Sequence, residues 1–278
     1  MKLKIISYNI LADYLGNPDY MLVNKKHLDI NFRIKLLLKK IEKVINSNTI
    51  FCLQEVGLNQ LSDLQSYFFR HNFHVIYARE IAIIFSTSKF DILSLNIGNI
   101  KDLKYLIDKK HHELLESKNK FYIILSLQDK LKKRKFTISN THLISPPELN
   151  NLKLLQCYVI LKKLEEYFNV IFCGDLNSLP NSEVIGLLSN SKINTTLGRF
   201  TLNNKYKSTI NHNLITHHTK NARHGIFTAM LDYIFVQDNI NVKSCSKLNV
   251  RSKFNEKNLL PNKSEPSDHV MICNEISI

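Results

Sequence analysis

The chain has 278 residues, 44% of them hydrophobic, so it can bury a sizeable core and is not a globally disordered protein. Lysine and arginine outnumber aspartate and glutamate by 38 to 24, and a net charge of +14 favours a polyanionic partner, although solvated lysines would give the same total. Five cysteines without a CxxC pair favour a reducing compartment over a disulfide framework or zinc site, and no segment suits a bilayer span.

Apolar periodicity predicts alternating strands and helices within one domain, residues 1–278. In chain order we expect a strand at 3–7, a helix at 27–45, a strand at 49–53, a helix at 58–69, strands at 73–77 and 81–86, a charged helix-like surface segment at 99–118, a hairpin of strands 121–127 and 135–139, a helix at 149–168, a strand at 170–173, an irregular stretch at 191–225, and strands at 231–236, 242–250 and 270–276. The predicted fold class is α/β (α+β), a two-layer β-sandwich flanked by helices.

Polar side chains stand at or just beyond the ends of these apolar strands. They are Asn9, Glu55, His142, Asp175, Asn177, Asp232, Asp268 and His269. Each taken singly has an ordinary explanation as a turn former, a cap or a solvated strand end. As an ordered set they predict a shared site, because strand ends that gather at one mouth of a sandwich bring distant residues together.

Such a set suits phosphodiester hydrolysis. The carboxylate of Glu55 is the hard oxygen ligand that Mg²⁺ prefers, and a metal ion can neutralise charge on the scissile phosphate. Asp175 could orient or deprotonate water, and His142 and His269 could donate hydrogen bonds to the phosphate. Asp232, if adjacent to His269, would set the tautomer of that imidazole.

Six motifs occur in order along the chain: SYNIL (7–11), LQEV (53–56), NTHL (140–143), GDLNSLP (174–180), LDYIF (231–235) and PSDH (266–269). Together they resemble the endonuclease/exonuclease/phosphatase superfamily, and within it the branch of CCR4-type deadenylases, nocturnin, and the 2′-phosphodiesterase and Angel proteins. The resemblance runs from about residue 5 to residue 273. It implies a DNase I-like fold and dependence on Mg²⁺, with Mn²⁺ as an alternative.

The resemblance also implies residue roles. Catalytic roles fall to Asn9, His142, Asp175, Asn177, Asp232 and His269, metal binding to Glu55 with Asp268 as a second-metal ligand, and substrate contacts to Pro146, Phe227 and Arg33. For Phe227, ordinary core packing is the competing interpretation. The chain departs from the branch at residues 216–219, which read THHT where deadenylases tend to carry Thr-Asn-Tyr-Thr, so base preference stays open.

The leading expectation is a Mg²⁺-dependent 3′–5′ exoribonuclease that shortens poly(A) or related RNA. The alternatives are a 2′,5′-oligoadenylate phosphodiesterase, a nocturnin-like dinucleotide 2′-phosphatase, and a non-catalytic RNA-binding module, against which the presence of every expected acidic residue and histidine counts. The expected partner is RNA or a small nucleotide, not a membrane, with no leucine-rich-repeat docking module. A cytoplasmic location, or a nuclear one, is expected.

Overall fold

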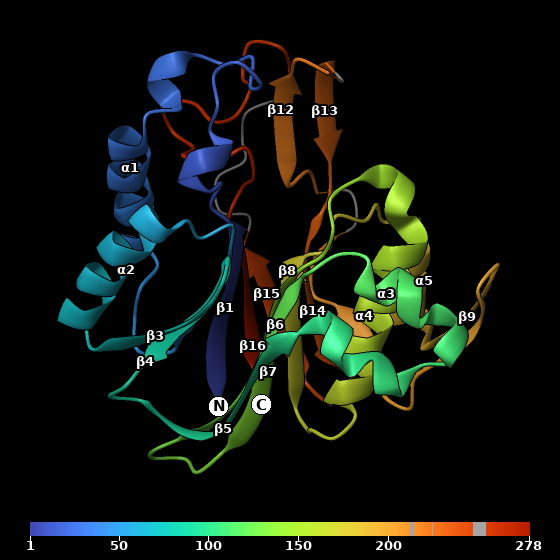
Figure 1. Ribbon diagram of the computed structural model, residues 1–278. Coiled ribbons are helices and arrows are strands. Elements are labelled where there is room, and N and C mark those ends of the chain that lie inside the picture. The colour runs from blue at the N-terminus through green and yellow to red at the C-terminus, as the bar shows by residue number, and fades with distance from the viewer. Residues whose placement is uncertain (212–213, 224, 247–253) are drawn as a thin grey trace.

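Two six-stranded sheets lie face to face between two layers of helices (Figure 1). The computed structural model describes residues 1–211, 214–223, 225–246 and 254–278. The first sheet has the order β15 (Asn241–Ser246), β16 (Ile272–Ser277), β1 (Lys2–Asn9), β2 (Thr49–Gln54), β4 (Ile81–Ser86), β3 (Phe73–Ala78). The second has the order β11 (Tyr206–Ser208), β14 (Asp232–Gln237), β8 (Val170–Asp175), β7 (Lys135–His142), β6 (Phe121–Asp129), β5 (Phe90–Asn99).

The helices cover the outer faces. The first sheet carries α1 (Ile30–Glu42) and α2 (Leu58–Arg70), and the second carries α3 (His112–Glu116), α4 (Asn150–Leu164) and α5 (Glu183–Asn190) (Figure 1). Smaller elements are the pairs β9 (Lys192–Thr195) with β10 (Gly198–Thr201) and β12 (His217–Asn221) with β13 (Gly225–Ala229), and the 3-10 turns η1 (Asp13–Leu15), η2 (Lys25–His27), η3 (Ile100–Leu106), η4 (Lys109–His111) and η5 (Pro147–Leu149). None of the described helices is both long and apolar enough to cross a membrane.

Strand β1 shows why both faces of the first sheet are buried. Its side chains alternate between faces, as in any strand. Leu3 and Ile5 pack in the cluster between the sheets, whereas Ile6 and Tyr8 pack under α1 and α2. The chain therefore reads as a nearly continuous apolar run here, and the predicted sandwich with outer helices is confirmed.

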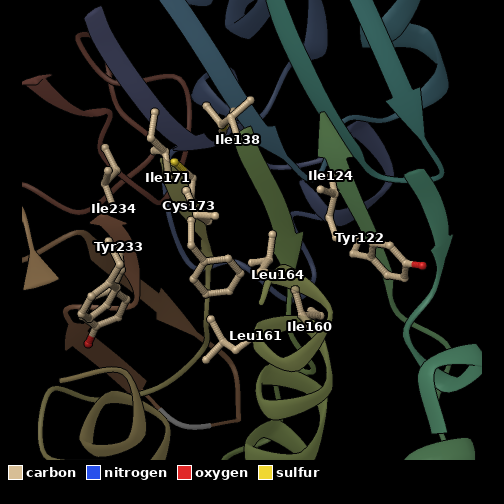
Figure 2. Close-up of a cluster of buried hydrophobic side chains, with 14 of the residues drawn as sticks. Tyr122, Ile124, Ile138, Ile160, Leu161, Leu164, Ile171, Cys173, Tyr233 and Ile234 are labelled. Carbon is tan, nitrogen blue, oxygen red and sulfur yellow. The ribbon is translucent and has the colours of Figure 1, made fainter. Parts of the chain in front are cut away.

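The second sheet is held from outside by α4. Figure 2 shows Ile160, Leu161 and Leu164 of this helix directed at the sheet, on the side where Tyr122 and Tyr233 also lie. All five side chains are buried. Burying each such apolar side chain contributes about 1.5–3 kcal/mol, so this layer fixes the position of β7, β8 and β14.

Two expectations about local structure were wrong, and one strand was missed. Residues 99–118 are helical, as expected, but they form η3, η4 and α3 rather than one surface segment, because Ile100, Leu103 and Leu115 turn inward to the core. Strand β5 was not expected, and the stretch predicted to be irregular contains β9 to β12. These strands are short or lie at sheet edges, where partners decide the conformation. The predicted strand at 242–250 is described only as far as Ser246.

The two ends of the chain meet at one end of the first sheet. Strands β1 and β16 are antiparallel neighbours with Lys2 opposite Ser277. The carboxyl ends of β1, β2, β7 and β8 point to the other end of the molecule, away from both termini (Figure 1). The polar residues predicted from the strand ends lie there.

Candidate active site

Register in the second sheet brings three predicted residues side by side. Strands β7 and β8 are parallel with His142 opposite Asp175, and β14 is antiparallel to β8 with Asp232 opposite Asp175. All three side chains are buried. Backbone pairing therefore sets the spacing of these groups before any side-chain contact forms.

Gly174 allows the close approach of β7 and β8 just before this row. A Cβ atom at Gly174 would lie 2.3 Å from the backbone oxygen of Thr141. Any side chain would push the two strands apart at the point where His142 and Asp175 stand. The glycine of the GDLNSLP motif thus has a packing role.

Asn9 joins the two sheets. It ends β1 opposite Gln54 of β2, and its Nδ2 donates to Glu55 Oε1 at 2.9 Å and to Asp175 Oδ2 at 3.0 Å. The backbone N–H of Leu11 donates to Asn9 Oδ1 at 3.0 Å. Because carboxylates only accept, this fully buried amide is oriented from both sides.

Two non-glycine residues of the site adopt left-handed backbone conformations. Glu55 has φ 52° and Asn177 has φ 47°. Asparagine tolerates this region, but glutamate does so at a cost of about 1–2 kcal/mol. The backbone N–H of Asn177 donates to Asp175 Oδ1 at 2.9 Å. Burial raises the pKa of Glu55, and His142 opposes that rise.

His142 lies between carboxylates on both sides. Its Nε2 is 3.9 Å from Glu55 Oε1 and 3.8 Å from Asp175 Oδ2, while its Nδ1 is 3.5 Å from Glu80 Oε2. Lys120 Nζ contacts Glu80 Oε1 at 2.6 Å. Burial alone would raise the pKa of Glu80, but His142 and Lys120 lower that pKa to about 2. Sequence reasoning missed Glu80 and Lys120, which follow no motif.

His269 is held as an imidazolium by two aspartates. Its Nδ1 lies 2.7 Å from Asp232 Oδ2 and its Nε2 lies 3.7 Å from Asp175 Oδ2. Burial would lower the pKa of His269, but Asp232 and Asp175 raise the pKa well above its usual value. The expected pairing of Asp232 with His269 is present in the geometry, and the ring is aimed at the row of strand ends.

Asp268 contacts a histidine that was not predicted as a site residue. Its Oδ2 lies 3.4 Å from His217 Nε2, and the ring of His217 is 4.7 Å from that of His269 and 5.3 Å from that of Phe227. Burial would raise the pKa of Asp268, but His217 and His269 lower it. The signal for His217 was its place in the THHT element of residues 216–219.

Arg33 supports the PSDH segment, residues 266–269, through a buried hydrogen bond. It is 1% exposed, and its Nε donates to the carbonyl of Pro266 at 2.7 Å. Its Nη2 donates to the carbonyls of Ile10, at 2.8 Å, and Leu11. The guanidinium ties the segment after β1 to the PSDH segment, and the expected substrate contact of Arg33 stays a prediction.

A cavity of about 670 Å³ adjoins the cluster. Its lining includes Asn177 and Phe227, together with Ser145 and Pro147 on either side of half-buried Pro146. Phe227 is 42% exposed, so core packing is the wrong interpretation of this residue. The ring is free to lie against a ligand in the cavity.

The site offers donors suited to a metal ion. Ligand atoms of Glu55, His142 and Asp175 lie within 4.8 Å of one another, as do those of His217, Asp268 and His269. Among the residues that the structure describes, the Glu55 Oε2 atom accepts one long hydrogen bond, of 3.4 Å, from the N–H of Ala12. This oxygen retains lone pairs for a cation, and its hard-donor character fits Mg²⁺.

Comparison with known proteins agrees with this geometry. The Endonuclease/Exonuclease/phosphatase family matches residues 6–269. Human 2′,5′-phosphodiesterase 12 is 27% identical over 98% of this chain, which spans about half, 51%, of that protein. RNA exonuclease NGL1 of Saccharomyces cerevisiae is 23% identical, and the alignment covers 99% of this chain and 92% of the yeast protein.

A solved structure supports the fold. The structure of ANGEL2, a 2′,3′-cyclic phosphatase, in complex with adenosine-2′,3′-vanadate superposes with a TM-score of 0.83 and 20% identity. The superposition covers 99% of this chain and 95% of that one. The match extends over both sheets and the outer helices.

Proposed function

Because this chain belongs to the endonuclease/exonuclease/phosphatase family and is a phosphoester hydrolase, we propose that it is a Mg²⁺-dependent 3′–5′ exoribonuclease acting on poly(A) or related RNA. One observation carries the proposal. Asn9 binds Glu55 and Asp175 at once, so acidic groups from both sheets meet beside two histidines at one mouth. The net charge of +14 favours a polyanionic substrate.

In this proposal Glu55 holds the metal, and Asp268 is the candidate ligand of a second ion. When bound, Mg²⁺ supplies neutralisation of charge on the scissile phosphate. The amide of Asn9 keeps the Glu55 carboxylate in place, and the segment that carries Asp268 is anchored to β1 because Ser267 Oγ donates to the carbonyl of Asn9 at 2.7 Å.

The remaining groups act on the phosphate and on water. His269 donates from Nε2 to a phosphate oxygen while Asp232 balances its charge, and His142 donates from the neighbouring strand. Asp175 orients or deprotonates the attacking water, since Asn9 and the N–H of Asn177 hold its carboxylate still.

The test uses 5′-labelled oligo(A) with Mg²⁺ and follows product length with time. The wild type should shorten the RNA from its 3′ end, and Glu55→Gln should lower kcat/KM by about 10²-fold or more. Glu113→Gln, at an exposed position of α3, is the matched control and should leave the rate unchanged. No cleavage by the wild type, or equal cleavage by Glu55→Gln, would reject the proposal.

A second candidate is hydrolysis of 2′,5′-linked oligoadenylate. The similarity to human 2′,5′-phosphodiesterase 12 over 98% of this chain favours it. One apparatus can serve several substrates, so a panel of oligo(A), mixed RNA, 2′,5′-oligoadenylate and NADPH separates the possibilities. A higher kcat/KM on 2′,5′-oligoadenylate would select this candidate, and preference for NADPH would select the dinucleotide 2′-phosphatase.

A further inference from the structure

A buried lysine lies on the wall of the cavity beside the active site. Lys153, in the first turn of α4, is only 2% exposed and lines the cavity. Within the described part of the chain, no acceptor lies at hydrogen-bond distance from its Nζ and no carboxylate at ion-pair distance. Asp175 and Glu148 favour its charge from farther away, while burial lowers the pKa of Lys153.

Burying an ammonium group without a paired ion or hydrogen bond lowers the stability of the folded protein. Charges removed from water are ordinarily compensated by a paired ion and hydrogen bonds. Surface lysines of the same helix follow that rule, since Lys162 pairs with Glu165 and Lys163 with Glu166. Lys153 differs because it lines the cavity, so a ligand there can supply an acceptor for its ammonium group.

The cavity wall also contains the starts of two helices. Asn150 and Asn151 begin α4, whose N-cap has no side-chain hydrogen bond, and Ser182 caps α5. The N-terminal end of a helix carries partial positive charge and attracts phosphate. Glu183, in the first turn of α5, is the one carboxylate among the described residues of the cavity lining and offsets part of that field.

The cavity lining also includes apolar side chains and touches the catalytic cluster. Phe227 and Leu231 are part of it, and Asn177 belongs both to the cavity and to the hydrogen-bonded surroundings of Asp175. A base or ribose can lie on Phe227 when one phosphate is in the cluster. A second phosphate on the same nucleoside can then reach Lys153.

We propose that this cavity holds a nucleoside bearing a phosphate at each end, and that Lys153 binds the phosphate next to the scissile one. The inference rests on the proposed function for the position of the scissile phosphate. It makes Lys153 a specificity residue, which favours phosphodiesters within an oligonucleotide over substrates with a single phosphate.

The test measures binding. Adenosine 3′,5′-bisphosphate and AMP contain no internucleotide diester, so each can be titrated calorimetrically into the protein in Mg²⁺ buffer, with chromatography afterwards to show that their phosphomonoesters are intact. The wild type should bind the bisphosphate about tenfold or more tightly than AMP, the gain expected of a charge-assisted hydrogen bond. Lys153→Met should abolish this difference, Lys153→Arg should keep part of it, and Lys163→Met, on the same helix, should keep all of it.

Stability gives a second measurement. Replacing an unpaired buried charge by an apolar side chain of similar volume should leave the melting temperature unchanged or raise it. A lower melting temperature for Lys153→Met would show that the protein itself satisfies the ammonium, and would overturn the proposal. So would equal wild-type affinity for the two nucleotides, or a preference for the bisphosphate that survives Lys153→Met. These measurements do not require cleavage of a diester. They can therefore be interpreted even if the protein has no nuclease activity on oligo(A).

Discussion

The two sheets contribute to the site in different ways. In the second sheet His142, Asp175 and Asp232 are strand residues, opposite one another in register. In the first sheet only Asn9 lies within a strand, whereas Glu55 follows β2 in a left-handed conformation and His269 precedes β16. Backbone pairing between strands positions the site residues of the second sheet, and side-chain hydrogen bonds position those of the first sheet.

This difference predicts where substitutions act. A change in the second-sheet half should remove chemistry and leave the fold intact, because the ladder does not depend on the side chain. A change in the supports of the other half should lower stability and activity together, since few contacts hold each segment. The following substitutions test this contrast, from the largest expected effect to the smallest.

Asp232→Asn should have the largest effect. It removes one of the carboxylates that raise the pKa of His269, so that pKa should fall and less of the imidazole should be charged, and kcat should fall by about 10³-fold. The melting temperature should change little, because the β8–β14 ladder remains. Single-turnover cleavage and thermal unfolding measure the two quantities, with Asp238→Asn, exposed beyond the other end of β14, as control. A loss of stability equal to the loss of rate would contradict the contrast.

Glu80→Gln tests the contact between the two halves. The pKa of Glu80 falls from 4.5 to about 2, so its charge stabilises the folded state above pH 4.5 and this contribution disappears as pH falls toward 2. Its size is no more than about 3 kcal/mol. Urea unfolding between pH 2 and pH 7 should therefore show a weaker pH dependence in the variant.

Glu42→Gln, at an exposed position of α1, is the control for that experiment and should keep the wild-type pH dependence. If the free energy of unfolding of Glu80→Gln depended on pH as it does in the wild type, His142 and Lys120 would not stabilise the Glu80 carboxylate.

Arg33→Lys should have a smaller effect on both properties. A single ammonium cannot reach Pro266 and Ile10 together, because only the guanidinium fork donates in both directions. The free energy of unfolding should fall by about 2 kcal/mol, and kcat/KM by about tenfold, since the PSDH segment loosens. Arg70→Lys, exposed at the end of α2, should change neither. Activity lost without stability would instead assign Arg33 a direct role at the substrate.

Sequence alone predicts the residues that depend on strand ends. Apolar runs ending in Asn9, Asp175 and Asp232 place side chains at one edge, and alternation explains the buried faces of β1. Glu80 and Lys153 escaped prediction for a physical reason. Glu80 lies in the turn between β3 and β4, and Lys153 lies on a helix. The importance of each comes from distant neighbours, which are His142 for Glu80 and the cavity for Lys153.

Strand β5 was missed for another reason. Leu93, Leu95 and Ile97 alternate with small or polar residues, yet these apolar side chains are exposed because the strand lies at a sheet edge. It forms because β6 offers a backbone partner along its whole length. Local periodicity contains no record of such a partner.

The pairing of Lys2 with Ser277 has a practical consequence. An affinity handle or fluorophore placed at residue 1 or residue 278 would emerge beside the opposite end of the sandwich from Asn9 and Asp175 (Figure 1). If the protein were immobilised by either terminus, the end of the sandwich that carries the candidate active site would face the solution. Neighbouring termini also suit circular permutation, in which a short linker joins residue 278 to residue 1 and new ends are cut elsewhere.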